Sequence, residues 1–255
     1  MLIFCAFAIH VMNGIIREDK VKRDNMFSGF TKETVDFLWD IKLNNNRSWY
    51  NEHKELCKRV LLIPMQELAN DIYDAFEREH PEMELNVHMS RIYRDARRLY
   101  GRGPYKDYLW FTLFDASSEH WSGKPSFWFE IASDRWSYGV GCYDERTEMM
   151  RRFRKRINAN PEPLRELDAL LASQTEFVLT GEDYKKQYQD CKYPDLQKWY
   201  GKRNFAIDHT QAIGPDITSP DFGNRIINGL LFLVPFYDYF YPIGRDLSSD
   251  DEENE

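Results

Sequence analysis

The chain has 255 residues, of which 42% are apolar and 15% aromatic, and its formal net charge is −8. One large domain is the simplest expectation for this length, and the aromatic side chains bury enough area for a core without disulfides. Six acids lie within residues 246–255, so the rest of the chain is nearly balanced and gives no strong nucleic-acid signal. The four cysteines form no C-x-x-C pair, which argues against a zinc ribbon or thioredoxin-type pair and favours a reducing, cytoplasmic compartment.

The first 25 residues are predicted to lie outside the core. Residues 1–16 are mostly apolar, as in a signal or anchor segment. No Lys or Arg precedes this run, it is shorter than the roughly 18 residues that span a bilayer, and no cleavage site follows it. A membrane anchor is therefore the weaker alternative. We predict a non-core extension over 1–25, one α+β domain over 26–245 and a disordered acidic tail over 246–255.

Two helical stretches open the predicted domain. Apolar residues at helical spacing after a Thr31 cap predict a helix over 32–43, which a run of three asparagines then ends. A second helical pattern runs from Ser48 to Phe76. Pro64 is expected either to kink that helix or to begin a new one.

Beyond Pro81 the apolar period changes to two, which is typical of strands. A tight turn at 133–135 is expected to join the third strand to the fourth, and Glu176–Leu179 is a candidate edge strand. The predicted fold class is α+β, with a mainly antiparallel sheet of four to five strands and helices before and after it. The four main strands are predicted at Val87–Tyr93, Tyr108–Phe114, Ser126–Ile131 and Trp136–Gly141, the first two pairing antiparallel.

Helical spacing returns in the second half of the chain. It predicts helices over 149–157 and 164–171. The basic run Arg151–Arg156 is interpreted as the solvated face of the first of these, because a basic helix face is weak evidence for nucleic-acid binding. A last helix is predicted over Pro220–Tyr237, with a kink near Pro235.

The strongest candidate site is the loop between the first two predicted strands. Residues 91–106 hold six cations and one acid, and Gly101 and Gly103 let the backbone turn sharply. Guanidinium groups present forked donors to phosphate or carboxylate oxygens, so the loop predicts a small anionic ligand. A purely structural Arg–carboxylate pair is the alternative. The candidate ligand-binding residues are Arg91, Arg94, Arg97, Tyr105, Lys106 and Asn45, and the candidate catalytic base is Asp95, which is also expected to be the only acid close to these cations.

Other residues that carry chemistry give weaker signals. The histidines form no H-x-x-x-H pattern and no glycine-rich phosphate loop precedes a helix, so we predict no metal and no cofactor. Asp208–His209 looks like half of a general-base pair, but no serine lies in a nucleophile elbow, which argues against a catalytic triad. Residues 44–46 either only break the first helix or send one asparagine amide to the basic loop.

Several motifs carry a resemblance to a known family, and the most specific are Arg94-Asp95-x-Arg97 and Pro104-Tyr105-Lys106. Together they resemble the family catalogued as domain of unknown function number 2461, known mainly as bacterial conserved hypothetical proteins. The resemblance runs from Phe27 to about Tyr241, implies one domain beginning near Met26, and brings no agreed activity. The further matching pieces are Phe27–Phe30, Phe37-Leu38, Asn44-Asn45 with Trp49-Tyr50, Arg91–Arg94, Gly139–Tyr143, Phe153-Arg154 with Ile157, and Lys202–Phe205.

The chain departs from that pattern between the two specific motifs. It has Arg98-Leu99 and Gly101-Arg102 where many relatives have Phe-Ser and Asp-Lys. The change removes a carboxylate that might act as an acid or base, and therefore weakens the case for a hydrolase built on this loop.

Three functions remain open on the sequence. The first is a binding protein for a small anionic ligand at the basic loop, and the second is a metal-independent enzyme that uses the same pocket. The third is a protein-interaction module that exposes an aromatic sheet face. A concave site requires the sheet aromatics to lie buried beneath it, whereas a module exposes them as one patch; the residues that decide are Tyr108, Trp110, Trp128 and Trp136. Ligand identity, pathway and oligomeric state are left undetermined.

Overall fold

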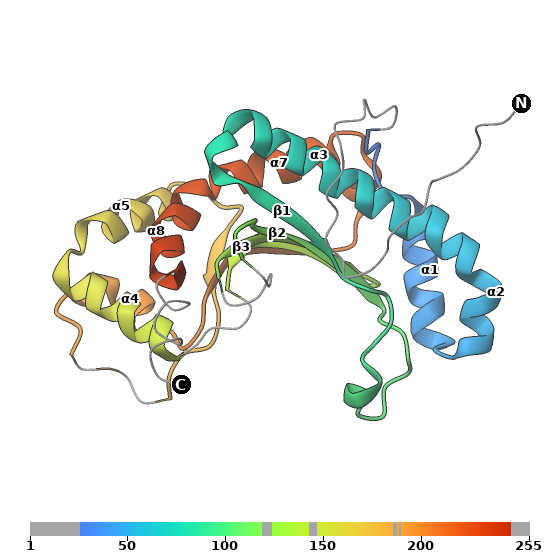
Figure 1. The fold of residues 1–255 in the computed structure, drawn as a ribbon, viewed down its shortest axis with the longest axis horizontal. Coiled ribbons are helices and arrows are strands. Elements are labelled where there is room, and N and C mark those ends of the chain that lie inside the picture. The colour runs from blue at the N-terminus through green and yellow to red at the C-terminus, as the bar shows by residue number, and fades with distance from the viewer. Residues whose placement is uncertain (1–25, 119–123, 143–146, 186–187, 189, 246–255) are drawn as a thin grey trace, which may run out of the picture.

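A computed structural model describes residues 26–118, 124–142, 147–185, 188 and 190–245, so the predicted extension 1–25 and acidic tail 246–255 lie outside it. The described chain builds one antiparallel sheet in the order β1-β2-β3-β4-β6-β5, arched in Figure 1 between groups of helices. The predicted α+β class and antiparallel pairing of the first strands are confirmed. The strands are β1 Leu85–Met89, β2 Tyr108–Asp115, β3 Ser126–Ala132, β4 Arg135–Gly141, β5 Val178–Thr180 and β6 Ala206–Ala212.

The strand missed by the sequence prediction is β6, which makes the sheet six-stranded rather than four- or five-stranded. Its core-facing residues are Ile207, His209 and Gln211, so only one of three is apolar and the usual alternation is hidden. This segment forms a strand because its backbone pairs with that of the apolar strand β4. The first strand is also shorter than predicted, because Tyr93 lies beyond it in an isolated bridge with Tyr105.

The N-terminal helices follow the predicted pattern. Helix α1 spans Lys32–Leu43 behind a Thr31 cap, and Asn46 caps helix α2, Arg47–Cys57. A π-helical turn over Lys58–Leu62 then leads into α3, Ile63–Glu79, which has Pro64 in its first turn. Pro64 thus lies in the first turn of α3, which is the second of the two expectations. The residues before it are already helical, so a π-helical turn and not a non-helical break precedes the proline.

The predicted C-terminal helix is two helices. Helix α7 ends at Phe232 and α8 begins at Val234, with a bend of 48° between them. Pro235 is the second residue of α8, where its ring would clash with the carbonyl four residues earlier in a continuous helix. No single described helix is long and apolar enough to cross a bilayer, and only this bent pair reaches that length and hydropathy when counted together. The remaining helices are α4 Thr147–Ala159, α5 Glu162–Ala172, α6 Gln197–Tyr200, α7 Phe222–Phe232 and α8 Val234–Arg245.

Side-chain alternation gives the sheet two unlike faces. The core face packs against α3 over β1 and β2, and against α7 and α8 over β4. Its apolar residues join one hydrophobic cluster that runs from Phe27 to Ile243. The opposite face, which we call the open face, carries half-buried aromatic residues and Glu130, together with buried polar residues and glycines. Its members include Tyr108, Trp110, Thr112, Ser126, Trp128, Glu130, Gly139, Gly141 and Asp208.

The basic run of α4 contains one exception to its predicted solvated face. Phe153 and Ile157 are buried as predicted, but Arg154 is buried with them. Its guanidinium donates to the carbonyl oxygens of Tyr200 at 2.9 Å and Lys202 at 2.7 Å, and lies 4.1 Å from the centre of the Tyr188 ring. Arg154 therefore fixes the segment before β6 to α4 through backbone and aromatic contacts.

Helix α8 is anchored to the end of β2 by the buried carboxylate of Asp115. Tyr241 donates to Asp115 Oδ2 at 2.6 Å, and Lys124 Nζ lies 3.0 Å from the same oxygen. Burial alone would raise the pKa of Asp115, but hydrogen bonds from Tyr241 and Ser117 outweigh it and hold that pKa below its ordinary value. The carboxylate is thus charged and bonded at neutral pH, and it joins α8 to the sheet.

We expect Tyr241→Phe to lower the free energy of unfolding by about 1.5–3 kcal/mol, the range for a hydrogen bond to a charged group. Urea denaturation at pH 7 measures this loss. Tyr100→Phe is the matched control, because the Tyr100 side chain is exposed at the tip of the basic loop. An equal, small effect of both variants would show that the Asp115 bond does not hold α8.

Candidate functional site

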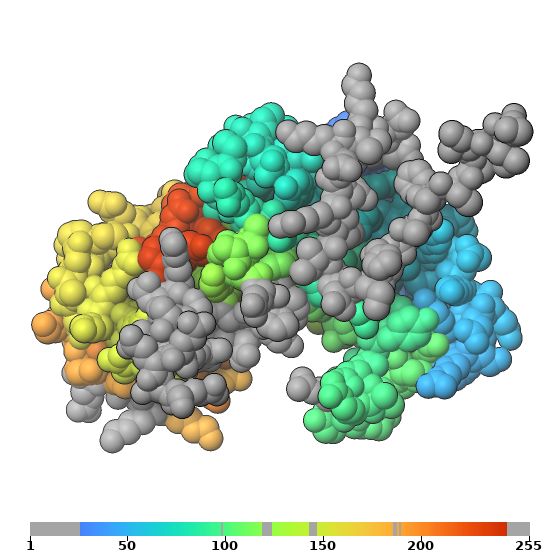
Figure 2. All heavy atoms as spheres, viewed as in Figure 1, coloured from blue at the N-terminus to red at the C-terminus, as the bar shows by residue number. Residues whose placement is uncertain are grey.

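The basic loop is a hairpin that extends β1 and β2 beyond the sheet, and we call residues 91–106 the basic arm. The Arg94 amide donates to the Pro104 carbonyl at 2.8 Å, and the Lys106 amide donates to the Ile92 carbonyl at 2.7 Å. Tyr100 and Gly101 turn the chain with positive φ angles of 47° and 77°. The arm stands out as a green lobe beside α2 in Figure 2.

Asn45 attaches the arm to the turn between α1 and α2. Its Nδ2 donates to the Tyr105 carbonyl, and its Oδ1 accepts from the Tyr105 amide, both at 2.9 Å. A Cβ at Gly103 would lie 2.2 Å from Asn45 Oδ1, so this position has no room for a side chain. The Asn45 amide thus reaches the arm, which is one of the two alternatives predicted for residues 44–46. Its two hydrogen bonds take the place of those that a neighbouring strand would make with the Tyr105 backbone.

Arg94 pairs with Asp107, so the expectation that Asp95 is the only acid near these cations is wrong. Arg94 Nη2 lies 3.0 Å from Asp107 Oδ1, and its Nε donates to the Tyr105 carbonyl at 2.8 Å. Lys42 lies 3.6 Å from the same carboxylate. Asp95 instead accepts from the Arg97 backbone and guanidinium, as an exposed local turn. The strand pattern of the sequence does not predict the Arg94–Asp107 pair, because a bend after Lys106 turns the Asp107 carboxylate towards Arg94.

The other predicted site residues separate into two groups. Arg94 and Lys106 both approach the Tyr108 ring, at 5.7 Å and 5.8 Å from its centre. Arg91 and Arg97 are exposed on the arm. The structure therefore brings two of the four predicted cations together at the open face.

A first hollow of about 310 Å³ lies between the arm and α2. The Tyr50 ring stacks on that of Tyr105 at 4.2 Å and meets that of Tyr93 edge-on at 5.5 Å. These rings hold the arm against α2. The hollow lies beside them and is also lined by Arg47 and Arg94. Its lining residues are Arg47, Asn51, Tyr93, Arg94, Ala96, Leu99, Pro104 and Tyr105.

A second hollow of about 250 Å³, which we call the sheet cleft, lies on the open face. Register places Trp110 beside Glu130 and Thr112 beside Trp128. Next to them, β4 has glycines at positions 139 and 141 and therefore no side chains on this face. The two indoles thus border a shallow depression in the surface of the sheet. The cleft is lined by Trp110, Thr112, Ser126, Trp128, Glu130, Gly141, Cys142 and Ala206.

Lys106 lies at the rim of the sheet cleft, where the arm joins β2. Its Nζ is 5.8 Å from the centres of the Tyr108 and Trp110 rings. Among the described residues no carboxylate lies within ion-pair distance of it. Burial, and then the charge of Arg94, lower the pKa of Lys106, whereas burial raises the pKa of Glu130 despite Arg135 at 3.2 Å. Lys106 and Glu130 thus both lie beside Trp110, and their mutual attraction partly offsets the two opposite pKa shifts.

Trp128 also lines the cleft. Within the described part of the chain its half-buried indole makes no ring contact and no side-chain hydrogen bond. Trp136, in contrast, is buried on the core face, with its ring 4.9 Å from that of Phe222. The aromatic residues of the sheet are therefore divided between a packed core and a partly open cleft.

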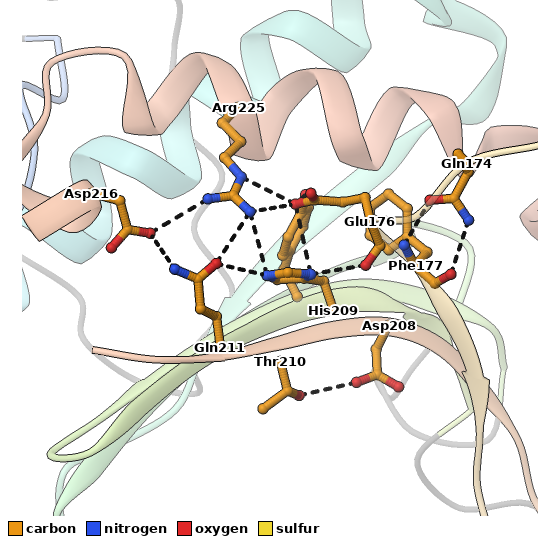
Figure 3. A network of polar contacts seen from close by, with 10 residues as sticks. Gln174, Glu176, Phe177, Asp208, His209, Thr210, Gln211, Asp216 and Arg225 are labelled. Atoms are coloured by element: carbon orange, nitrogen blue, oxygen red, sulfur yellow. Dashed lines mark hydrogen bonds and ion pairs between the residues drawn. The ribbon is translucent and has the colours of Figure 1, made fainter. Parts of the chain in front are cut away.

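A separate polar cluster lies on the core face and joins β6 to α7 (Figure 3). Glu176 Oε1 accepts from Tyr138 at 2.8 Å and from Arg225 Nη2 at 2.9 Å, and Arg225 also contacts Asp216 at 3.4 Å. His209 Nδ1 lies 2.8 Å from the Glu176 carbonyl oxygen. Burial opposes it, but the bonds from Tyr138 and Arg225 lower the pKa of Glu176. These mutual contacts identify a structural network.

Asp208 and His209 lie on opposite faces of β6, as Figure 3 shows. Asp208 accepts from Thr180 and Thr210 on the open-face side, while His209 joins the cluster around Glu176. Successive side chains of a strand diverge in this way, so this dipeptide is not a general-base pair. Among the described residues, moreover, no three His, Cys, Asp or Glu side chains are grouped to hold a metal ion.

The cleft residues Trp110, Trp128 and Glu130 were absent from the predicted ligand site. Their signal was available in the strand pattern, because each alternates with a core residue and so belongs to one face. The sequence could not reveal that the described helices in contact with the sheet pack on its other face, and the arm, with its dense charge, was the more conspicuous feature.

We expect Arg94→Ala to lower the free energy of unfolding by about 2–3 kcal/mol, below the usual cost of breaking a buried pair because Lys42 remains near Asp107. A double-mutant cycle with Asp107→Asn, followed by urea denaturation, measures the coupling. Arg97→Ala is the control, since that side chain is 87% exposed. A loss of stability as small as that of the control would show that the Asp107 pair does not hold Arg94 in place, and Arg94 would again be a candidate ligand-binding cation.

We also expect the Glu176 network to stabilise the fold in a pH-dependent way. The lowered pKa means that this stability is present above the unfolded value near 4.5 and is lost as pH falls through the folded value. Glu176→Gln should therefore cost about 1–2 kcal/mol at pH 7 and progressively less below pH ~4.5. Glu182→Gln, an exposed control, should show no such convergence. A cost that is constant from pH 7 to pH ~3 would refute the assignment.

Comparison with known proteins places the chain in a family. No curated protein matches the chain. The sequence does match the family described as conserved hypothetical protein (DUF2461) over residues 33–239, which include the basic arm, the sheet cleft and the Glu176 network. That match covers most of the 255 residues, and the protein therefore belongs to the DUF2461 family.

Proposed function

We propose that the protein binds a small molecule with a flat ring and an acidic group, and that the sheet cleft is its site. The observation that carries the proposal is the half-buried Lys106, which has no carboxylate within ion-pair distance among the described residues and lies 5.8 Å from the centre of the Trp110 ring, which lines a hollow of about 250 Å³. Glu130 attracts this cation from beyond ion-pair distance, and a bound anion would give it a direct counter-charge, which a half-buried cation needs.

Each part of the cleft would contact one part of such a ligand. Trp128 offers an apolar face on which a ring can stack, and Trp110, whose ring also contacts that of His88 at 5.6 Å, lines the cleft beside it. The Lys106 ammonium can donate to a carboxylate or phosphate at the rim, as a charge-assisted hydrogen bond. Glu130 pairs with Trp110 in the sheet register, and its carboxylate can accept a hydrogen bond from a ring N–H or hydroxyl of the ligand. The ligand class remains the small anion predicted from the basic loop, although its ring would lie on the sheet.

The form of the hollow favours a small molecule over a protein partner. A flat interaction module would expose several sheet aromatics as a patch, but Trp110 and Trp128 are half-buried in a concavity and Trp136 lies in the core. A second candidate function is catalysis at the same place. It is favoured by the raised pKa of Glu130 beside the lowered pKa of Lys106, a pattern that suits a general acid and base.

We expect a screen of nucleoside monophosphates and aromatic carboxylates, read by calorimetry, to give binders that lose affinity in Trp128→Ala and Lys106→Gln. Loss of one stacking partner should cost about 1–3 kcal/mol of binding free energy. Trp39→Ala is the matched control, because Trp39 is 41% exposed on α1 and remote from the cleft lining. If the variants bind every hit as tightly as the unmodified protein, the site lies elsewhere.

The pH profile of the same titration tests the charge directly. Because the pKa of Lys106 is lowered from 10.5, its positive charge should be lost at a lower pH than that of an ordinary lysine. Affinity for an anionic hit should therefore fall as pH rises towards 10.5, with its midpoint below that value, while Lys106→Arg keeps its charge and its affinity. A profile that is the same in both proteins would remove Lys106 from the site.

A further inference from the structure

The exposed side of the basic arm is not used by the proposed function. Arg94 and Lys106 face Asp107 and the cleft, whereas Arg91 is exposed and has no hydrogen-bonded or ionic partner among the described residues. Arg97 contacts Asp95 but its side chain is 87% exposed. The arm therefore keeps accessible positive charge after its internal pairs are counted.

Exposed aromatic rings accompany this charge. The Tyr93 side chain is 50% exposed and that of Tyr100 is 81% exposed, at the middle and the tip of the arm. The Arg102 guanidinium lies 6.0 Å from the centre of the Tyr100 ring. Arginines that meet phosphates, alternating with rings on which bases stack, are how proteins hold single-stranded nucleic acid without reading its sequence.

Lys106, the last residue of the arm, lies 5.8 Å from the centre of the Trp110 ring, which lines the cleft. In Figures 1 and 2 the arm projects beside the sheet. A chain of phosphates with attached rings could thus place one ring in the cleft while its neighbouring phosphates follow the arm. A compact small molecule could reach the cleft but not the arm tip.

We propose that the basic arm binds the phosphates of a short single-stranded nucleic acid, one base of which enters the sheet cleft. The part of this inference that concerns the base rests on the proposed function, whereas the part that concerns the phosphates rests on the arm alone. The net charge of the chain does not oppose it, because six of the acids lie within 246–255 and the arm itself is strongly basic.

The experiment is fluorescence anisotropy of the full chain with a labelled eight-nucleotide single strand, repeated over a range of salt concentrations. We expect binding tighter than that of the matching mononucleotide, with affinity falling as salt rises. Because each phosphate contact contributes about −0.7 to the slope of log affinity against log salt, Arg91→Gln/Arg97→Gln should reduce that slope by about 1.4. Arg151→Gln/Lys155→Gln removes two charges from exposed positions on α4 and should leave the slope unchanged.

The outcomes separate the two proposals. A strand that binds no tighter than the mononucleotide, or a slope equally changed by the α4 control, overturns the arm inference and leaves the cleft untouched. Equal affinity for heparin with no effect of Tyr100→Ala also overturns it, because binding would then be to charge alone. If the arm variant changes the slope but Trp128→Ala has no effect on either ligand, the arm inference stands and the cleft function fails. Thermal melting of each variant confirms that it folds.

Discussion

Alternation of side chains along six antiparallel strands is the constraint on which the rest of this structure depends. Once Leu109, Phe111 and Leu113 are buried under helices, the residues between them must occupy the other face. That face receives Trp110 and Trp128, whose size suits a core, but no described helix packs over them. The half-exposed indoles on this face add to the support that Lys106 gives to the proposal of a ligand there.

The basic arm contains cations in two different environments. Its inner cations are bound to Asp107 and to backbone carbonyls, so they hold the hairpin at a fixed angle to the sheet. Its outer cations have exposed side chains. Charge density alone cannot distinguish these roles, because the distinction depends on which side chains face the sheet. The structural alternative therefore holds for Arg94, whereas ligand binding by the other cations stays a proposal.

Much of the fold could be predicted from sequence because the main elements carry strong local signals. The Thr31 cap, the period of two in β2 to β4 and the helical spacing of α4 each act within a few residues. What could not be predicted depends on partners distant in sequence. Strand β6 is polar and forms against β4, Arg94 finds Asp107 only after a bend, and Arg154 is buried by tyrosines that follow it by 30 residues or more.

The attachment of the arm by Asn45 couples two positions that are far apart in sequence. The amide can bond both backbone groups of Tyr105 only while residue 103 contributes no Cβ, because the asparagine fills that space. A side chain at 103 would push the amide away and remove one of the contacts that hold the arm, so the residue types acceptable at positions 45 and 103 depend on each other. Without the amide, the direction of the arm would depend on the stacking of Tyr105 on Tyr50 and on the contacts of Arg94.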